Sequence, residues 1–454
     1  MDGFTRMRFI VAMILSFCLA LPVSGARITA QSPTSAPKEE FKFGKADLDL
    51  LDQASLLDKR FEREGQVFLD EATNAYLQRV GESLLPGDRN LEHVIWKFRA
   101  LRDPLPNAFA LPNGSVYVNT GLIALLDNES QLAAILAHEI THVLNRHAYL
   151  QNRSNRKKYL AMNIIAAIGT WNPAGGVAGA AIDIIAAISP FILVTTMFGY
   201  SRDLEKEADL KGVDVMIIAE YPPEEMVKAL KLLSNDIEGE QLKFFYNDHP
   251  QLKDRISYVT TYLGSKANKT TAAFELHREK TAYLTRIETV SRHDIQLAIN
   301  SARFRTAVYL SQKFADFRPD SAENIFWLAE SYRALGPRSP QLTEKELTDN
   351  ARKDAAKKRA KLMPEEEERE LLGTAAGQQN WKNNQQKAEE LYLRSLKLDQ
   401  PLPMAHRGLG MLYEKIGRTK EAIDEYQVYL DLAPEALDHQ RVQRRMQTLK
   451  GSAN

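Results

Sequence analysis

Residues 138–142 read His-Glu-Ile-Thr-His, and their types and spacing indicate metal-dependent hydrolysis. Two histidines four positions apart lie on one face of a helix, so both imidazoles can reach one metal ion. Glu139 lies on the flank of that face, where its carboxylate can take the proton of the attacking water. The pattern therefore predicts one Zn²⁺ per chain, with His138 and His142 as ligands and Glu139 as the general base.

A catalytic zinc site needs a third protein ligand, and the sequence after His142 limits where it can be. The metzincin pattern HExxHxxGxxH is excluded, because Asn145 replaces its glycine and His147 falls one position too early. A glutamate at short range, as in thermolysin, is also excluded, because no acidic residue stands between His142 and Asp183. The remaining candidates are Asp183, Asp203, Glu205, Glu207 and Asp209.

Residues 201–216, SRDLEKEADLKGVDVM, hold four of these candidates on one predicted helix. Glu205 and Asp209 are four positions apart and share a face, whereas Glu207 points about 160° away from Glu205. An aspartate one turn after a ligand glutamate can accept the free N–H of a ligand histidine and fix its tautomer. We expect Glu205 to be the third ligand and Asp209 to support a histidine. Glu207 is the alternative ligand, although a solvated helix face explains it better.

The segments around this motif predict an α+β fold that is mostly helical, with a small sheet. Residues 45–86 have helical periodicity, and 96–101 (WKFRAL) is strand-like. Asn113-Gly114 between apolar residues predicts a hairpin over 109–118, and a helix is expected from about 129 to 148. We expect the strand near 116–119 to form a sheet edge beside the zinc helix. An extended peptide would pair with that edge through backbone hydrogen bonds.

The C-terminal part repeats itself. Ala388 and Tyr392 recur 34 positions later as Ala422 and Tyr426, and this period is typical of tetratricopeptide repeats. We predict a metallopeptidase domain over 42–270 and an all-α repeat solenoid over 271–454, interrupted by a charged insertion at about 337–384. Such solenoids bind partners along one face.

The N-terminus predicts export. Residues 1–26 combine arginines, a short apolar run and small residues, as a secretory signal does, and 27–41 read as a linker. The only cysteine, Cys18, lies inside that signal. Residues 159–199 are strongly apolar, and we expect burial, with peripheral membrane contact as the alternative. The chain has 59 basic and 59 acidic residues, so its charge does not favour nucleic acid as a partner.

Three motifs, HEITHVLNRH, SRDLEKEAD and DHPQLKDRI, resemble the zinc metallopeptidase family of HtpX and the CAAX prenyl proteases. The resemblance covers about residues 45–260 and includes PNAFALPNGSVYVNTGLI at 106–123. The family pattern is HExxH plus ExxxD, with the first glutamate as third zinc ligand, which implies Glu205 and Asp209. A signal peptide followed by repeats is most similar to the periplasmic BepA-type members.

That resemblance also implies a role for His249 near the zinc, either as a brake on the enzyme or as a stabiliser of the oxyanion; a structural histidine that caps the next helix is the alternative. It further implies a periplasmic protease that acts on unfolded or misassembled envelope proteins. Its repeats would recruit partners such as the outer-membrane assembly machinery. A chaperone or assembly scaffold with a latent protease site is the second hypothesis.

Overall fold

The structure is a computed structural model that describes residues 42–87, 91–154, 200–235, 237, 252–266, 279–341, 364–398 and 402–452. The predicted signal and linker, the apolar segment 159–199, Asp183 and His249 lie outside these residues, as do residues 342–363 of the predicted insertion. None of the described helices is long and apolar enough to cross a membrane. The described chain is mostly helical and contains a small three-stranded sheet, as expected.

Two helices precede the sheet, α2 (Lys45–Arg63) and α3 (Glu71–Ser83). Helix α3 begins where the Asp70 carboxylate accepts a hydrogen bond from the backbone N–H of Thr73, which satisfies a free donor at the helix start. The predicted helical region is therefore confirmed as two helices separated by a short connection.

The sheet consists of β1 (Lys97–Leu101), β2 (Ala108–Ala110) and β3 (Ser115–Asn119), in the order β1-β3-β2. Strand β1 runs parallel to β3, and β2 runs antiparallel to it. The predicted strand and hairpin are thus confirmed. Gly114 has a φ of 92° in the hairpin turn, a conformation that glycine adopts without steric cost.

The expectation that residues 116–119 form a sheet edge is wrong, because β3 is the central strand. Every residue of β3 is buried, as is typical of a strand covered on both sides. The two edge strands are β1 and β2. Strand β1 is bonded to the segment that contains Val67 and Phe68, so the β2 edge is the open one among the described residues. Asn107 and Leu111 bond to β3 through O···N distances of 2.8 Å each. Antiparallel alternation then turns the backbone groups of Ala108 and Ala110 away from β3, toward the open edge.

Helix α4 (Thr120–Leu125) follows β3 directly and leads into α5 (Glu129–Leu144), which carries the HExxH motif. Nearly every residue of α5 is buried, so this helix forms the centre of the domain rather than an amphipathic surface helix. The Asn128 side chain caps it by accepting from the backbone N–H of Gln131. Helix α5 ends earlier than expected, because Arg146 has a φ of 56° and breaks the helix before residues 147–154 resume it.

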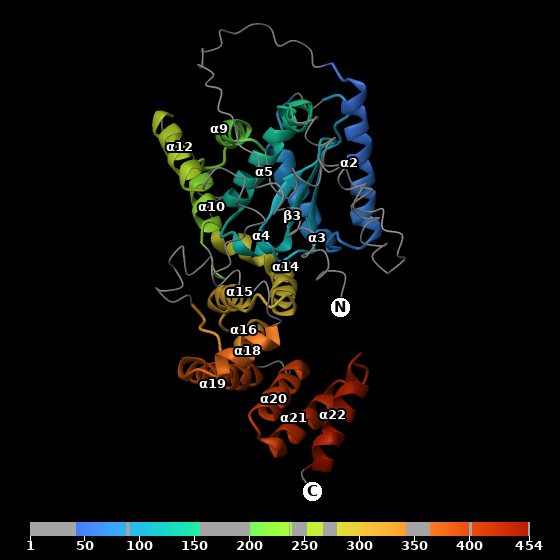
Figure 1. The fold of residues 1–454 in the computed structure, drawn as a ribbon, viewed down its shortest axis with the longest axis vertical. Coiled ribbons are helices and arrows are strands. Elements are labelled where there is room, and N and C mark those ends of the chain that lie inside the picture. The colour runs from blue at the N-terminus through green and yellow to red at the C-terminus, as the bar shows by residue number, and fades with distance from the viewer. Residues whose placement is uncertain are drawn as a thin grey trace.

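Helices α9 (Arg202–Ile218), α10 (Glu225–Leu233) and α12 (Leu252–Ser265) surround α5 on the side away from α2 (Figure 1). Helices α9 and α10 pack directly on α5, and α12 packs on both of them.

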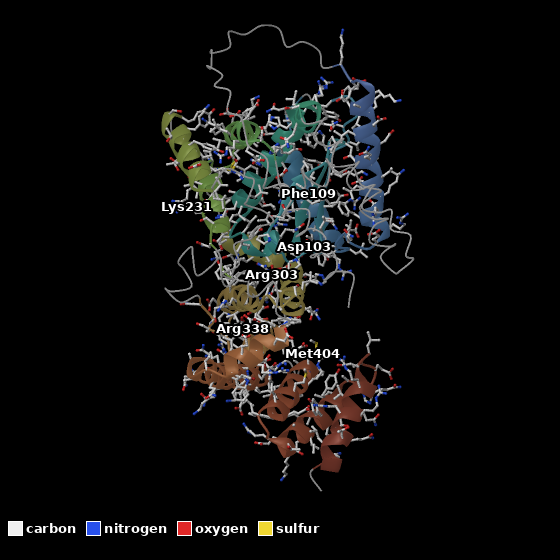
Figure 2. The ribbon with its side chains drawn as sticks, in the orientation of Figure 1. Asp103, Phe109, Lys231, Arg303, Arg338 and Met404 are labelled. Carbon is white, nitrogen blue, oxygen red and sulfur yellow. The ribbon has the colours of Figure 1, made fainter. Side chains whose placement is uncertain are left out.

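The C-terminal half is a succession of helices that extends away from this domain, as Figures 1 and 2 show. They are α14 (Lys280–Asn300), α15 (Phe304–Phe317), α16 (Ala322–Leu335), α18 (Pro364–Leu372), α19 (Ala375–Lys397), α20 (Pro403–Lys415), α21 (Thr419–Leu432) and α22 (His439–Ser452). Gly336 and Gly417 occupy matching positions just after α16 and α20, and both have positive φ. The tetratricopeptide assignment stays a prediction.

The first of these helices belongs to the core of the N-terminal domain. Tyr283, Ile287 and Val290 of α14 are buried in the same cluster as the apolar side chains of α3, α4 and α5. The Tyr283 hydroxyl donates to the carbonyl of Ile123 at 2.9 Å. The predicted boundary near residue 270 stays a prediction, but the hydrophobic core continues across it.

Candidate metal centre

Helices α5 and α9 bring three of the predicted ligand residues together. His138 and His142 lie one turn apart on α5, Glu205 lies in the first turn of α9, and all three are buried. Gly212 allows the two helices to approach closely, since a Cβ there would lie 3.3 Å from the backbone nitrogen of His138. The ligand atoms of the three residues all lie within 4.8 Å of one another.

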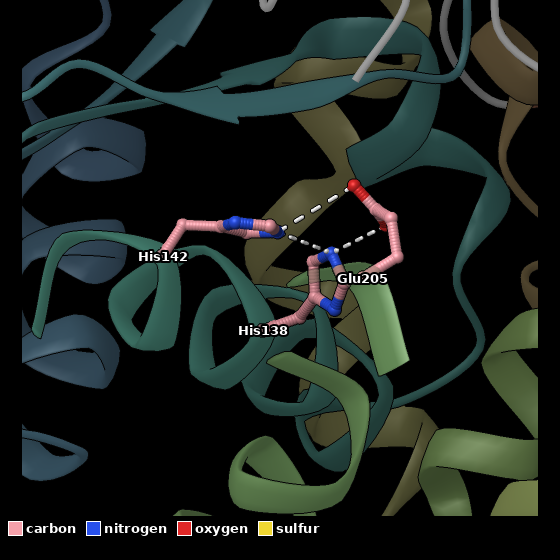
Figure 3. A group of neighbouring side chains, drawn as sticks. All are labelled: His138, His142 and Glu205. Carbon is pink, nitrogen blue, oxygen red and sulfur yellow. Dashed lines mark hydrogen bonds and ion pairs between the residues drawn. The ribbon is translucent and has the colours of Figure 1, made fainter. Parts of the chain in front are cut away.

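Their side chains converge on one point, as Figure 3 shows. The two Nε2 atoms are 3.1 Å apart. Glu205 places Oε2 at 3.4 Å from Nε2 of His138 and Oε1 at 3.7 Å from Nε2 of His142. The backbone N–H of Tyr200 donates to Oε1 of Glu205 and fixes the orientation of the carboxylate.

His138 is held from behind by Asp209, the predicted supporting residue. Its Nδ1 lies 2.9 Å from Oδ1 of Asp209, which is fully buried one helical turn after Glu205. Arg255 of α12 bonds to both oxygens of Asp209, at 2.8 and 2.6 Å, and Tyr258 donates a further hydrogen bond to it. Burial alone would raise the pKa of Asp209, but Arg255 and His138 hold that pKa well below its usual range.

Sequence reasoning assigned no role to Arg255, although this residue stands in the DHPQLKDRI motif. Its guanidinium is buried, and it also lies 3.7 Å from Glu205. Two buried carboxylates therefore share one buried cation. The DHPQLKDRI motif was the one signal in the sequence that pointed to Arg255. Its distance of forty-six positions from Asp209 matches no helical or strand periodicity, so spacing could not predict their contact.

His142 is held differently, by aromatic and imidazole contacts. Its Nδ1 lies 2.9 Å from Nδ1 of His147, and the ring of Tyr200 stacks on it at a centroid distance of 4.1 Å. His147 in turn lies 3.5 Å from Glu207. The alternative ligand Glu207 thus faces the outer side of this chain of contacts, where Lys211 pairs with it at 2.6 Å. Asp203 is exposed.

Glu139 lines a small cavity of about 60 Å³ beside the three converging side chains. Residues 106–110, which contain β2, form the opposite wall of this cavity. Burial raises the pKa of Glu139 to about 7, and the neighbouring Glu205 adds to that shift. A carboxyl group with this pKa can accept and return a proton near neutral pH. A hydrogen bond from the backbone of Ala110 orients it toward the β2 edge.

Comparisons with known proteins find similarity in the part of the chain that holds these residues. Residues 71–263 match the model of peptidase family M48. The mitochondrial metalloendopeptidase OMA1 of Schizosaccharomyces pombe is 31% identical over 194 residues, which cover 42% of this chain and 53% of that protein. The putative beta-barrel assembly-enhancing protease of Vibrio cholerae is 29% identical over 198 residues, covering 42% of this chain and 39% of that protein. The beta-barrel assembly-enhancing protease of Escherichia coli is 28% identical over 171 residues, which cover 36% of this chain and 33% of that protein.

This chain spans about half or less of the length of these relatives. The matched region contains the HExxH helix, Glu205, Asp209 and Arg255. Together, the family match and the metalloendopeptidase names of the relatives support a metalloprotease domain that is similar to family M48 over residues 71–263.

Proposed function

We propose that this M48-type metalloprotease is a zinc-dependent endopeptidase whose metal is held by His138, His142 and Glu205. The observation that carries the proposal is the spacing of the three ligand atoms. In a tetrahedral site with ligands about 2.0–2.1 Å from zinc, neighbouring ligand atoms are about 3.3 Å apart. The observed separations of 3.1, 3.4 and 3.7 Å bracket that value. Two imidazoles and one carboxylate are also a ligand set that catalytic zinc uses.

The surrounding residues divide the work of hydrolysis. Zinc, when bound, polarises the scissile carbonyl and activates the attacking water. Glu139 takes a proton from that water and delivers it to the leaving amine. Its pKa of about 7 suits a group that must both accept and release a proton near neutral pH. Asp209 accepts the Nδ1–H of His138 and so leaves Nε2 free to face the metal.

The open edge of β2 is the proposed place for the substrate. Ala108 and Ala110 turn their backbone groups to the side on which Glu139 and His138 lie, and an extended peptide can add there as a further strand. Hydrogen bonds between the β2 backbone and a substrate backbone depend little on the side chains of the substrate. This mode of binding supports substrates that are unfolded rather than defined by one cleavage motif.

The wider role follows from the sequence and from the names of the relatives. We place the protein in the periplasm, where it degrades misfolded or misassembled envelope proteins, with the helices after residue 280 recruiting partners as tetratricopeptide repeats do. Beta-barrel assembly-enhancing proteases among its relatives support this role. A chaperone or assembly scaffold with a latent protease site is the second candidate, because the C-terminal helices pack around a hydrophobic core of their own. A helical module with its own core can bind a partner without any catalysis.

Zinc content and casein cleavage of the full chain test the proposal. We expect about one zinc per chain, loss of zinc in Glu205→Gln, and retained zinc without cleavage in Glu139→Gln. Asp203→Asn is the matched control, since it removes an exposed carboxylate from the same helix. Loss of zinc in Glu207→Gln with full zinc in Glu205→Gln would show that the ligand is wrongly assigned. If Glu139→Gln restored full function to cells that lack the protein, the scaffold hypothesis would replace the enzyme.

A further inference from the structure

A groove of about 940 Å³ lies among the last helices of the chain, far in sequence from the metal centre. Residues of α20 and α22 form most of its wall, with Tyr426 of α21 and Arg333 of α16. The groove is lined by six cationic side chains: Arg333, Arg407, Lys415, Arg441, Arg444 and Arg445. Among the residues that the structure describes, only two carboxylates, Glu414 and Asp438, line it with them.

The positive charge of the groove is not cancelled by its own ion pairs. Asp438 is shared by Arg407 and Arg441, and Glu414 is bonded to Arg445 and Tyr426. Two further carboxylates from outside the lining, Glu330 and Glu368, pair with Arg333 and Lys415. Six cations therefore face four anions, although the chain as a whole is neutral.

The arginines of the groove differ in the donors that they offer to a ligand. The Nε of Arg407 is buried and makes no hydrogen bond to any residue that the structure describes, while Nη1 donates to Asp438 at 2.7 Å. A ligand in the groove cannot reach this buried nitrogen, so it adds no donor for binding. Arg444 is exposed, and its side chain forms no ion pair within the described part of the chain.

From these observations we infer that the groove binds an acidic peptide segment of a partner protein. Arginine pairs with carboxylates through two parallel hydrogen bonds, which gives geometric selectivity as well as attraction. Met411 and Val442 also line the groove, so the segment combines carboxylates with apolar side chains. The inference gives a partner chemistry to the recruiting role proposed above, but binding in the groove does not require the metal centre.

A peptide fits the lining better than nucleic acid does. A phosphate backbone carries charge at regular intervals and is bound by an extended stripe of cations. Here Glu414 and Asp438 interrupt the cations inside the groove and would lie against such a backbone. A peptide can place apolar or neutral residues opposite these two carboxylates.

The test is fluorescence anisotropy with full-length Glu139→Gln protein, which leaves the peptide uncut. The probes are a labelled twelve-residue peptide with alternating glutamate and leucine, and the same peptide with every glutamate replaced by glutamine. We expect the acidic peptide to bind at least about tenfold more tightly at low salt, and the difference to shrink as salt rises. Added to this background, Arg444→Glu should weaken acidic-peptide binding about fivefold to tenfold.

Lys382→Glu is the matched control, because Lys382 is exposed on α19, does not line the groove, and forms no side-chain hydrogen bond or ion pair among the described residues. It should change binding less than about twofold. Arg441→Glu provides a second groove variant if Arg444→Glu proves unstable by circular dichroism. Equal binding of both peptides, or equal weakening by Arg444→Glu and Lys382→Glu, would overturn the inference.

Tighter, Arg444-dependent binding of single-stranded DNA or of phosphatidylglycerol vesicles would also overturn it, in favour of those ligands. Zinc content and casein cleavage of the unmodified active site are measured separately, so failure of the groove and failure of the protease proposal give different results.

Discussion

Replacing Arg255 by methionine should destabilise the metal centre more than any exposed substitution on the same helix. Arg255→Met keeps most of the side-chain volume and removes the cation. It leaves the fully buried Asp209 with His138 and Tyr258 as its polar partners among the described residues. Glu205, which is also fully buried, keeps the two histidines and the backbone N–H of Tyr200. The perturbation therefore isolates the charge of Arg255 from its packing.

The expected loss in the free energy of unfolding follows from the burial of both partners of the Arg255–Asp209 ion pair. Removing one partner of a buried, hydrogen-bonded pair costs about 3–5 kcal/mol, because the other charge stays in a poorly solvated place. Asp209→Asn should cost less, since asparagine is neutral and can still accept a hydrogen bond. In the double variant, the second substitution removes the stranded charge. We therefore expect a coupling free energy of about 2 kcal/mol or more between the two positions.

The effect should depend on pH with a definite sign. Arg255 holds the folded-state pKa of Asp209 below its unfolded value, so the resulting stability is present above about pH 4 and declines as pH falls below it. In Arg255→Met the pKa of Asp209 rises, because burial then dominates. The difference in stability between the two proteins should accordingly be largest at neutral pH and should shrink in acid.

The assays are urea unfolding of the metal-free protein at pH 7 and at pH 4, and zinc affinity by chelator competition. Loss of the support behind His138 should lower zinc affinity by about 10- to 100-fold. Lys253→Met is the control, since Lys253 is an exposed cation two positions away on α12. Additive effects in the double variant, or equal effects of Arg255→Met and Lys253→Met, would refute the role of the ion pair.

Three further outcomes are expected. His147→Ala should lower zinc affinity about tenfold by releasing the ring of His142; unchanged affinity in chelator competition would contradict that support. Asp294 has a pKa raised to about 7 by burial, above the unfolded value, so its folding penalty grows from about pH 4 to 7. Asp294→Asn should therefore stabilise the protein by up to about 4 kcal/mol at pH 8 and not at pH 4, as measured by urea unfolding, and an equal gain at both pH values would exclude this cause. A fragment that ends at residue 270 should unfold at lower urea than one that ends at 341, because it lacks α14; equal midpoints would show that α14 adds no stability to the core.

The candidate metal ligands could be predicted from the sequence because the residues of each helix are only a few positions apart. His138 and His142 are four positions apart on α5, and Glu205 and Asp209 are four positions apart on α9. Helical geometry alone therefore places the members of each pair on one face of their helix. The Asn113-Gly114 turn predicted the β2–β3 hairpin in the same way. The metal-ligand roles themselves stay predictions that the zinc measurements test.

Long-range contacts were beyond that reasoning. The order of the strands depends on the parallel pairing of β1 with β3, which no local sequence pattern predicts. Because of this pairing, β3 lies in the centre of the sheet and β2 lies at its edge. Arg255 reaches Asp209 from a third helix, so no periodicity links the two. No spacing rule predicted that His147 supports His142, because the contact between them forms only where Arg146 breaks the helix.

The junction between the metal centre and the C-terminal helices limits how the groove can serve the protease. The side chain of Lys313 of α15 is 7% exposed. Its Nζ donates to the carbonyls of Ala124, Leu125 and Leu126, which lie at the end of α4 just before α5 begins. The first C-terminal helices are therefore fixed to the segment that leads into the HExxH helix. A binding module held in this way raises the local concentration only of substrates long enough to span from the groove to β2. A partner bound through a short acidic segment would be recruited without being cleaved, whereas an unfolded chain bound at the same place would reach the active site.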